Sequence, residues 1–178
     1  MRTFYRSFPL AAVVLSLAAL AASSHNEKRQ FQAELKGINE VGPGIGAVST
    51  TAEGSFRAFV SRDGSSIAYR LSYSGLEGDI TQAHIHVGQV HTTGGISVWL
   101  CQTAASPSPT PDLTPMCPDP HTGSVTGTLT AENVVGPANS GVDPGEFAEL
   151  IRLIRSGVTY ANVHSTKVPS GEIRGQVR

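Results

Sequence analysis

The fold class follows from residues 55–73, which read SFRAFVSRDGSSIAYRLSY. Two runs in which apolar and polar residues alternate, 55–60 and 67–73, flank the turn Arg62-Asp63-Gly64. Such alternation is typical of half-buried strands, and a turn glycine accepts the positive φ that tight hairpins require. The segment therefore predicts an antiparallel β-hairpin with one buried face.

The same punctuated pattern continues along the chain and predicts further strands over residues 81–87, 96–101, 124–130, 159–164 and 172–177. One crossover helix is expected over about residues 144–156, because Asp143 suits the N-cap, Pro144 suits the first helical position and Gly157 ends the run. Its apolar stripe would be Phe147, Leu150, Ile151 and Ile154. Many short strands with one helix predict a mainly β fold, an antiparallel sandwich or barrel.

The N-terminus has the three regions of a secretory signal peptide, predicted over residues 1–23. Arg2 and Arg6 precede an uncharged stretch over 10–22, and polar residues follow. About 13 apolar residues fall short of the roughly 20 that span a bilayer, so cleavage is favoured over a membrane anchor. The expected product is a short polar tail, 24–30, and one domain, 31–178, exported to the periplasm or the extracellular space.

Two cysteines, Cys101 and Cys117, border a segment rich in Pro, Ser and Thr. In an oxidising compartment such a pair usually forms a disulfide. A thiolate metal site or a redox pair would need closer spacing. We therefore expect a surface loop that is closed at its base by one cystine.

The overall charge is nearly balanced. The chain has 13 Lys and Arg against 14 Asp and Glu, a formal net charge of −1. A nucleic-acid-binding domain usually carries a basic excess, so no nucleic-acid partner is expected.

The sharpest constellation of chemically active residues is AHIHVG, residues 83–88. On a strand, His84 and His86 point to the same face, roughly 7 Å apart at their Cα atoms. His164 ends another predicted strand, and three neutral imidazoles with an open fourth position suit zinc or copper. His91, in the loop that follows, is an additional candidate ligand. The competing interpretation places the histidines on a solvent-exposed face, where they bind nothing.

Three further polar residues are candidates for the surroundings of that site. Asn162 and Glu172, or backbone carbonyls, would accept from the second ring nitrogens of bound histidines. Arg174 shares a strand face with Glu172 and would pair with it or line a rim. The chain has no Gly-x-Ser-x-Gly elbow and, with both cysteines paired, no free thiol, so no catalytic residue is assigned.

Four stretches resemble the CHRD family, the repeat module of chordin that also occurs alone in many bacterial proteins. They are FQAELKGINEV (31–41), ITQAHIHVG (80–88), YANVHS (160–165) and PSGEIRGQV (169–177). Their order and spacing match the family over essentially the whole mature chain. The cysteine pair and the predicted helix resemble a bacterial single-domain branch.

The resemblance implies an immunoglobulin-like β-barrel similar to that of Cu/Zn superoxide dismutases. It implies a secreted, non-catalytic extracellular binding module with a protein partner. The alternative is a copper- or zinc-binding protein, or an enzyme of superoxide-dismutase type. The chain lacks a counterpart of the acidic zinc loop that dismutases carry.

Overall fold

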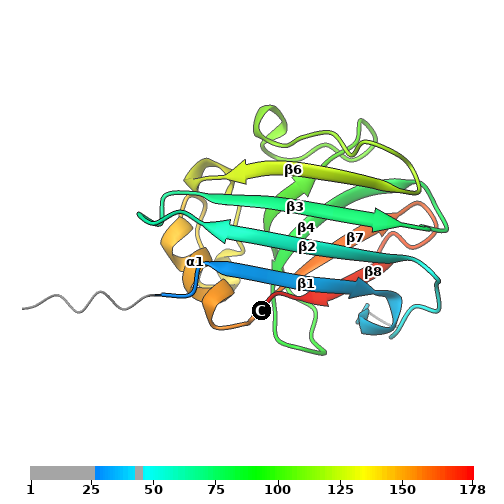
Figure 1. Ribbon diagram of the computed structural model, residues 1–178, viewed down its shortest axis with the longest axis horizontal. Helices are drawn as coiled ribbons and strands as arrows, with labels where there is room; N and C mark the ends of the chain where they lie inside the picture. The colour runs from blue at the N-terminus through cyan, green and yellow to red at the C-terminus, as the bar shows by residue number, and fades with distance from the viewer. Residues whose placement is uncertain (1–26, 43–45) are drawn as a thin grey trace, which may run out of the picture.

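The computed structural model describes residues 27–42 and 46–178 (Figure 1). The predicted signal peptide lies outside the described residues. The described residues form eight strands: β1 (Gln30–Lys36), β2 (Glu53–Val60), β3 (Ile67–Ser74), β4 (Ile80–Val87), β5 (Ile96–Cys101), β6 (Gly123–Leu129), β7 (Thr159–Ser165) and β8 (Ile173–Gln176). The helices are α1 (Phe147–Arg155) and four 3-10 turns, η1 (Gly37–Asn39), η2 (Pro111–Leu113), η3 (Ala131–Asn133) and η4 (Ala138–Ser140).

All neighbouring strands pair antiparallel in one sheet of order β5-β4-β7-β8-β1-β2-β3-β6. The sheet folds into two layers, with β6, β3, β2 and β1 in front of β4, β7 and β8 (Figure 1). The edge strands β5 and β6 approach each other, so the barrel is nearly closed. The mainly β, antiparallel barrel predicted from the sequence is confirmed.

The layers are continuous at the seam between β8 and β1. Lys36 pairs with Arg174 at one end of this seam. At the other end Gln32 and Arg178 exchange two backbone hydrogen bonds of 2.8 and 2.9 Å. The last residue of the chain therefore lies beside the first strand, as Figure 1 also shows.

The predicted hairpin is β2–β3, in which Val60 pairs with Ile67. Its inward residues Ile67, Tyr69, Leu71 and Tyr73 are all buried, as the alternation predicts. The Tyr69 hydroxyl crosses the core and donates to the Leu100 carbonyl on β5 at 2.6 Å. This bond joins the two layers through the interior.

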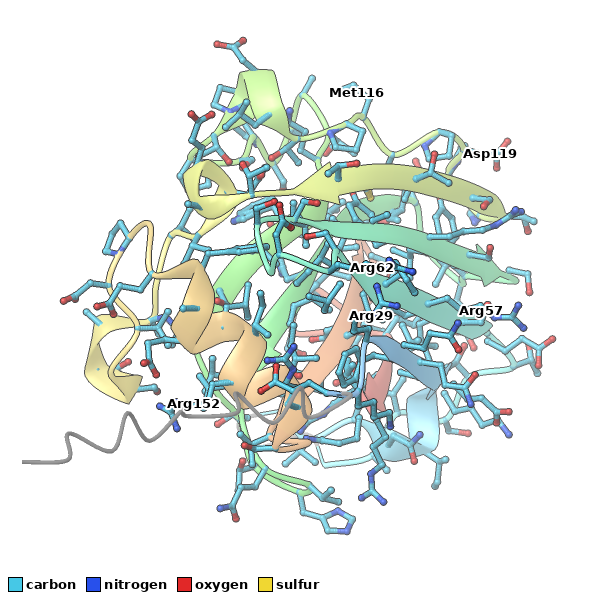
Figure 2. The ribbon with its side chains drawn as sticks, turned by 60° about the vertical axis from the view of Figure 1, so that its left-hand side comes forward. Arg29, Arg57, Arg62, Met116, Asp119 and Arg152 are labelled. Carbon is cyan, nitrogen blue, oxygen red and sulfur yellow. A yellow bond between two sulfur atoms is a disulfide. The ribbon has the colours of Figure 1, made fainter. Side chains whose placement is uncertain are left out.

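Helix α1 begins at Phe147, three residues later than predicted. Gly145 has φ +87°, outside the helical region, and the backbone N–H of Asp143 donates to the Glu146 carboxylate at 2.8 Å. Residues 143–146 therefore form a turn ahead of the helix. The predicted apolar stripe is buried, and Arg152 lies on the exposed side (Figure 2). No helix among residues 27–42 and 46–178 is long and apolar enough to cross a membrane.

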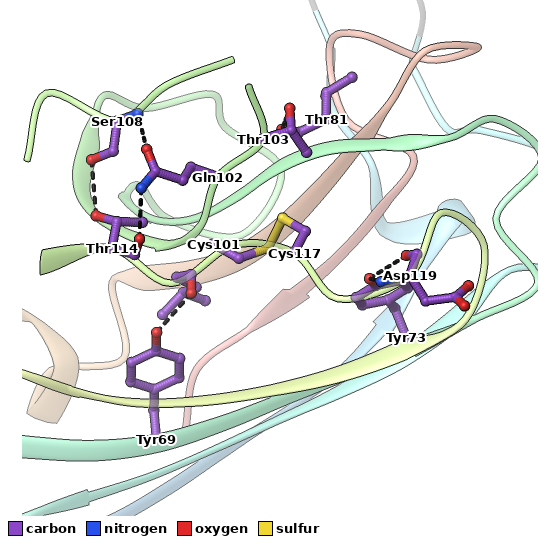
Figure 3. Close-up of a disulfide and its surroundings, with 11 residues drawn as sticks. Tyr69, Tyr73, Thr81, Cys101, Gln102, Thr103, Ser108, Thr114, Cys117 and Asp119 are labelled. Carbon is purple, nitrogen blue, oxygen red and sulfur yellow. Dashed lines mark hydrogen bonds between the residues drawn. A yellow bond between two sulfur atoms is a disulfide. The ribbon is translucent and has the colours of Figure 1, made fainter. Parts of the chain in front are cut away.

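The Cys101–Cys117 disulfide is present and joins the end of β5 to the far end of the predicted loop (Figure 3). Gln102 orders the loop interior, since its amide donates to the carbonyls of Pro111 and Thr114. Its side-chain oxygen accepts from the Ser108 N–H at 2.8 Å. The loop is thus held by a buried amide as well as by the cystine.

Candidate metal centre

Neighbouring strands bring the three predicted histidines together. His84 and His86 lie on β4 and His164 on β7, all on the face that points away from the barrel core. The prediction that His84 and His86 share a face is correct. The solvent-exposed interpretation is wrong, because the three residues are only 0%, 7% and 7% exposed. Loops cover this outer face.

Backbone carbonyls fix the orientation of two of the rings. His86 Nδ1 lies 3.0 Å from the Gly94 carbonyl and His164 Nδ1 lies 2.9 Å from the Pro169 carbonyl. A carbonyl can only accept, so Nδ1 carries the proton in both rings and Nε2 keeps its lone pair. His164 Nε2 then lies 3.2 Å from His84 Nδ1.

Burial keeps the cluster neutral. It lowers the pKa of His84, and proximity to His164 and His86 lowers that pKa further. Burial also lowers the pKa of His86 to about 4, although the hydrogen bond to Gly94 opposes the shift. The pKa of His164 is lowered for the same reason and opposed by Pro169. Neutral imidazole is the form that binds metal ions.

The ring nitrogens fit a single cation. One ligand atom from each histidine lies within 4.8 Å of the others. Tetrahedral ligands at about 2.0 Å from an ion are about 3.3 Å apart, close to the 3.2 Å between His84 and His164. The Nε2 atoms of His84 and His86 are buried without a hydrogen-bond partner. Buried polar atoms are rarely left unpaired, so His86 Nε2 is a ready ligand atom. One imidazole binds one ion through one nitrogen, so His84 would bind through Nδ1, the atom that faces His164.

Aromatic rings form the walls of the cluster. Trp99, the only tryptophan in the chain, meets His84 edge-on at a centroid distance of 4.2 Å. Tyr160 stacks on His86 at 4.7 Å, with an interplanar angle of 2°. The Arg174 guanidinium lies 3.4 Å from the centre of the same tyrosine ring. The walls therefore restrict rotation of the histidine rings.

The β4–β5 loop is tied down over the cluster by Arg174 and Tyr160. Arg174 donates to the carbonyls of Thr92 and Gln89 at 2.8 and 3.1 Å. The Gly94 N–H donates to the Tyr160 hydroxyl at 3.1 Å, while its carbonyl accepts from His86. A Cβ atom on Gly94 would lie 1.6 Å from the Val87 carbonyl oxygen, so only glycine fits there.

Glu40 is a functional candidate that the sequence reasoning missed. It is 4% exposed and accepts a hydrogen bond from Asn162, which pairs across the strands with His84. Burial raises the pKa of Glu40 to about 7, against the opposing effects of Asn162 and Arg174. Glu40 lies in the stretch 31–41 that resembles the CHRD family, and this was the only sequence feature that singled it out. Nothing in the neighbouring residues indicated that it would be buried.

The remaining predicted residues have other surroundings. Glu172 is fully buried away from the imidazoles, where it accepts from Thr50, Ser165 and the Glu77 N–H. It forms no ion pair with Arg174 among the described residues. His91 is exposed in the β4–β5 loop, outside the cluster. The second ring nitrogens of His86 and His164 bond to backbone carbonyls and not to Asn162 or Glu172.

Fold and site together define a small disulfide-bonded antiparallel β-barrel with a buried histidine cluster on one outer face. The family model of the CHRD domain matches residues 31–177, nearly the whole chain. The chain therefore belongs to the CHRD family, which supports a module of extracellular type. No curated protein and no solved structure matches the chain.

Proposed function

We propose that this chain is an exported, non-catalytic binding module that holds one copper or zinc ion on His84, His86 and His164. The observation that carries the proposal is the convergence of three buried, neutral imidazoles, in which His84 Nδ1 lies 3.2 Å from His164 Nε2 and His86 Nε2 has no hydrogen-bond partner. Desolvating these atoms costs free energy that a bound cation would return. A histidine cluster with a purely structural role would be expected to pair these atoms.

The hydrogen bonds that hold the histidine rings in place support the same proposal. Metal-binding histidines usually donate their other ring N–H to a carbonyl or carboxylate, which fixes the ring. His86 and His164 do this through Gly94 and Pro169. A shared cation would replace the proton between His84 Nδ1 and His164 Nε2.

The alternative is a copper enzyme of superoxide-dismutase type. The barrel, the His-x-His strand and a third histidine on the neighbouring strand favour it. Turnover would require substrate to reach the ion, and the ligands here lie beneath Trp99, Tyr160 and the β4–β5 loop. This covering favours retention of an ion over catalysis. Export and an extracellular protein partner are parts of the proposal that rest on residues 1–23 and on the family.

The test is a titration of metal-free protein with Cu²⁺ and with Zn²⁺ by calorimetry at pH 7.5 and pH 4. Wild type should bind one ion at pH 7.5 and lose affinity at pH 4, because protons then compete for His86. Trp99 fluorescence should be quenched by stoichiometric copper, since the indole touches His84.

Two variants decide the ligand assignment. His164→Ala should abolish one-to-one binding, whereas His91→Asn should keep it, since His91 is exposed and its φ of 63° suits asparagine. Circular dichroism must show that both variants are folded. Equal weak binding by wild type and His164→Ala would remove the metal site from the proposal.

A further inference from the structure

A basic groove crosses the outer face of β1, β2 and β3, in the layer opposite the histidine cluster. It measures about 1000 Å³ and is lined by Lys28, Arg29, Arg57 and Arg70. Figure 2 shows Arg29 and Arg57 on the same side of the molecule. The only acidic side chain of the lining, Glu27, is paired with Arg155. The nearly neutral composition therefore conceals a local concentration of positive charge.

Arg57 and Arg70 form the centre of this groove. They are directly opposite each other on β2 and β3, and both are exposed. Like charges in cross-strand pairs disfavour the sheet. Neither arginine forms an ion pair within the described part of the chain. Two adjacent guanidinium groups are thus left available to an external anion.

We propose that this groove binds a linear anionic polysaccharide, carboxylated or sulfated. Guanidinium groups bind such anions bidentately and keep their charge at any physiological pH. The groove is open and crosses three strands, whereas sites for small molecules are usually enclosed and mostly apolar. A chain with repeated charges can contact Arg57, Arg70 and Arg29 together.

The one exposed aromatic side chain of the groove lining, Phe59, argues for this ligand over nucleic acid. Single-stranded nucleic acids bind by stacking bases on exposed aromatic rings. Phe59 is 41% exposed, but the Arg29 guanidinium lies 4.8 Å from its ring centre and takes that position. Because Arg29 covers the ring on which a base would stack, an oligonucleotide would be attracted by charge alone.

The experiment measures binding of the mature protein to heparin oligosaccharides by calorimetry in low and moderate salt. Dextran serves as the neutral polysaccharide and a single-stranded oligonucleotide as the rival polyanion. Wild type should bind heparin in a salt-dependent way and should not bind dextran. Arg57→Ser with Arg70→Ser should weaken binding about tenfold or more, because two charge-assisted contacts are lost. Serine already occupies the same face of both strands at Ser55 and Ser72.

The control variant is Lys36→Ser with Arg152→Ser, which removes the same charge from outside the groove lining. It should bind heparin within about twofold of wild type, as distant surface charges are screened. Equal weakening by both double variants would overturn the proposal, as would oligonucleotide binding as tight as heparin binding. Circular dichroism should show that both variants are folded, and the outcome does not depend on bound metal.

Discussion

The two layers of the barrel share one core but differ on their outer faces. In the β1-β2-β3-β6 layer, buried and exposed residues alternate along β1, β2 and β3. In the β5-β4-β7-β8 layer, every residue of β7 is buried, and so are residues 83–86 of β4. Loops cover this second outer face, which we call the covered face, while the first is the open face.

The difference in solvent exposure decides which kind of ligand each face can bind. Side chains on the open face meet water, so their charges are screened. On the covered face, desolvation lowers the pKa of three histidines and raises that of Glu40. The covered face is therefore suited to holding an ion, and the open face to attracting a charged surface.

The largest expected effect comes from disturbing the cover itself. Gly94→Ala places a methyl group against the Val87 carbonyl, so the β4–β5 loop must move. We expect a loss of about 3 kcal/mol or more in the free energy of unfolding, and loss of metal binding. Urea denaturation and copper titration measure the two effects. Ala68→Ser also adds one heavy atom, at an exposed site on β3, and should leave both unchanged.

A second prediction uses the buried carboxyl group. The folded protein keeps a proton on Glu40 up to about pH 7, whereas the unfolded chain releases it near pH 4.5. The stability that Glu40 contributes is therefore present below pH 4.5 and is lost as the pH rises through 7. Gln at this position cannot ionise, so the unfolding free energy of Glu40→Gln relative to wild type should rise by about 3 kcal/mol over this range.

Denaturation of metal-free protein at pH 4.5 and pH 8 measures this difference. Glu34→Gln, at an exposed position of β1, is the matched control and should show little change between the two pH values. If the unfolding free energy of Glu40→Gln relative to wild type were the same at both pH values, the carboxyl group of Glu40 would not titrate between them.

The smallest effect compares two hydroxyl deletions. Tyr160→Phe leaves the Gly94 N–H without its acceptor and should cost about 1 kcal/mol. Ser72→Ala removes an exposed hydrogen bond to Ser124 and should cost less than about 0.5 kcal/mol. Thermal unfolding of the two variants tests the ranking, and a larger loss for Ser72→Ala would refute the distinction between the faces.

The open layer could be predicted from the sequence, because its strands alternate and one hairpin turn sets their register. The covered layer could be predicted only in part. The alternation of β4 placed His84 and His86 on one face, but exposure depends on loops that come from elsewhere in the chain. The sequence therefore left two interpretations of that face open, a metal site and a solvent-exposed surface, and the covering loops exclude the second.

The surroundings of the histidines depended on long-range contacts. The ring partners are carbonyls of Gly94 and Pro169, and any residue type offers a carbonyl, so no side-chain pattern could identify them. Glu40 reaches the cluster from the other end of the chain. The start of α1 was misplaced for a local reason, since Gly145 adopts a positive φ within the predicted first turn.

The backbone hydrogen bonds between Gln32 and Arg178 place the first strand and the C-terminal residue of the fold side by side. A fold with adjacent ends can be inserted into a host loop or strung into an array without remodelling its interior. A short linker between Arg178 and β1, with new ends opened in the β2–β3 turn, should therefore give a circular permutant that keeps the barrel. The same geometry makes this fold a convenient unit for duplication within longer chains.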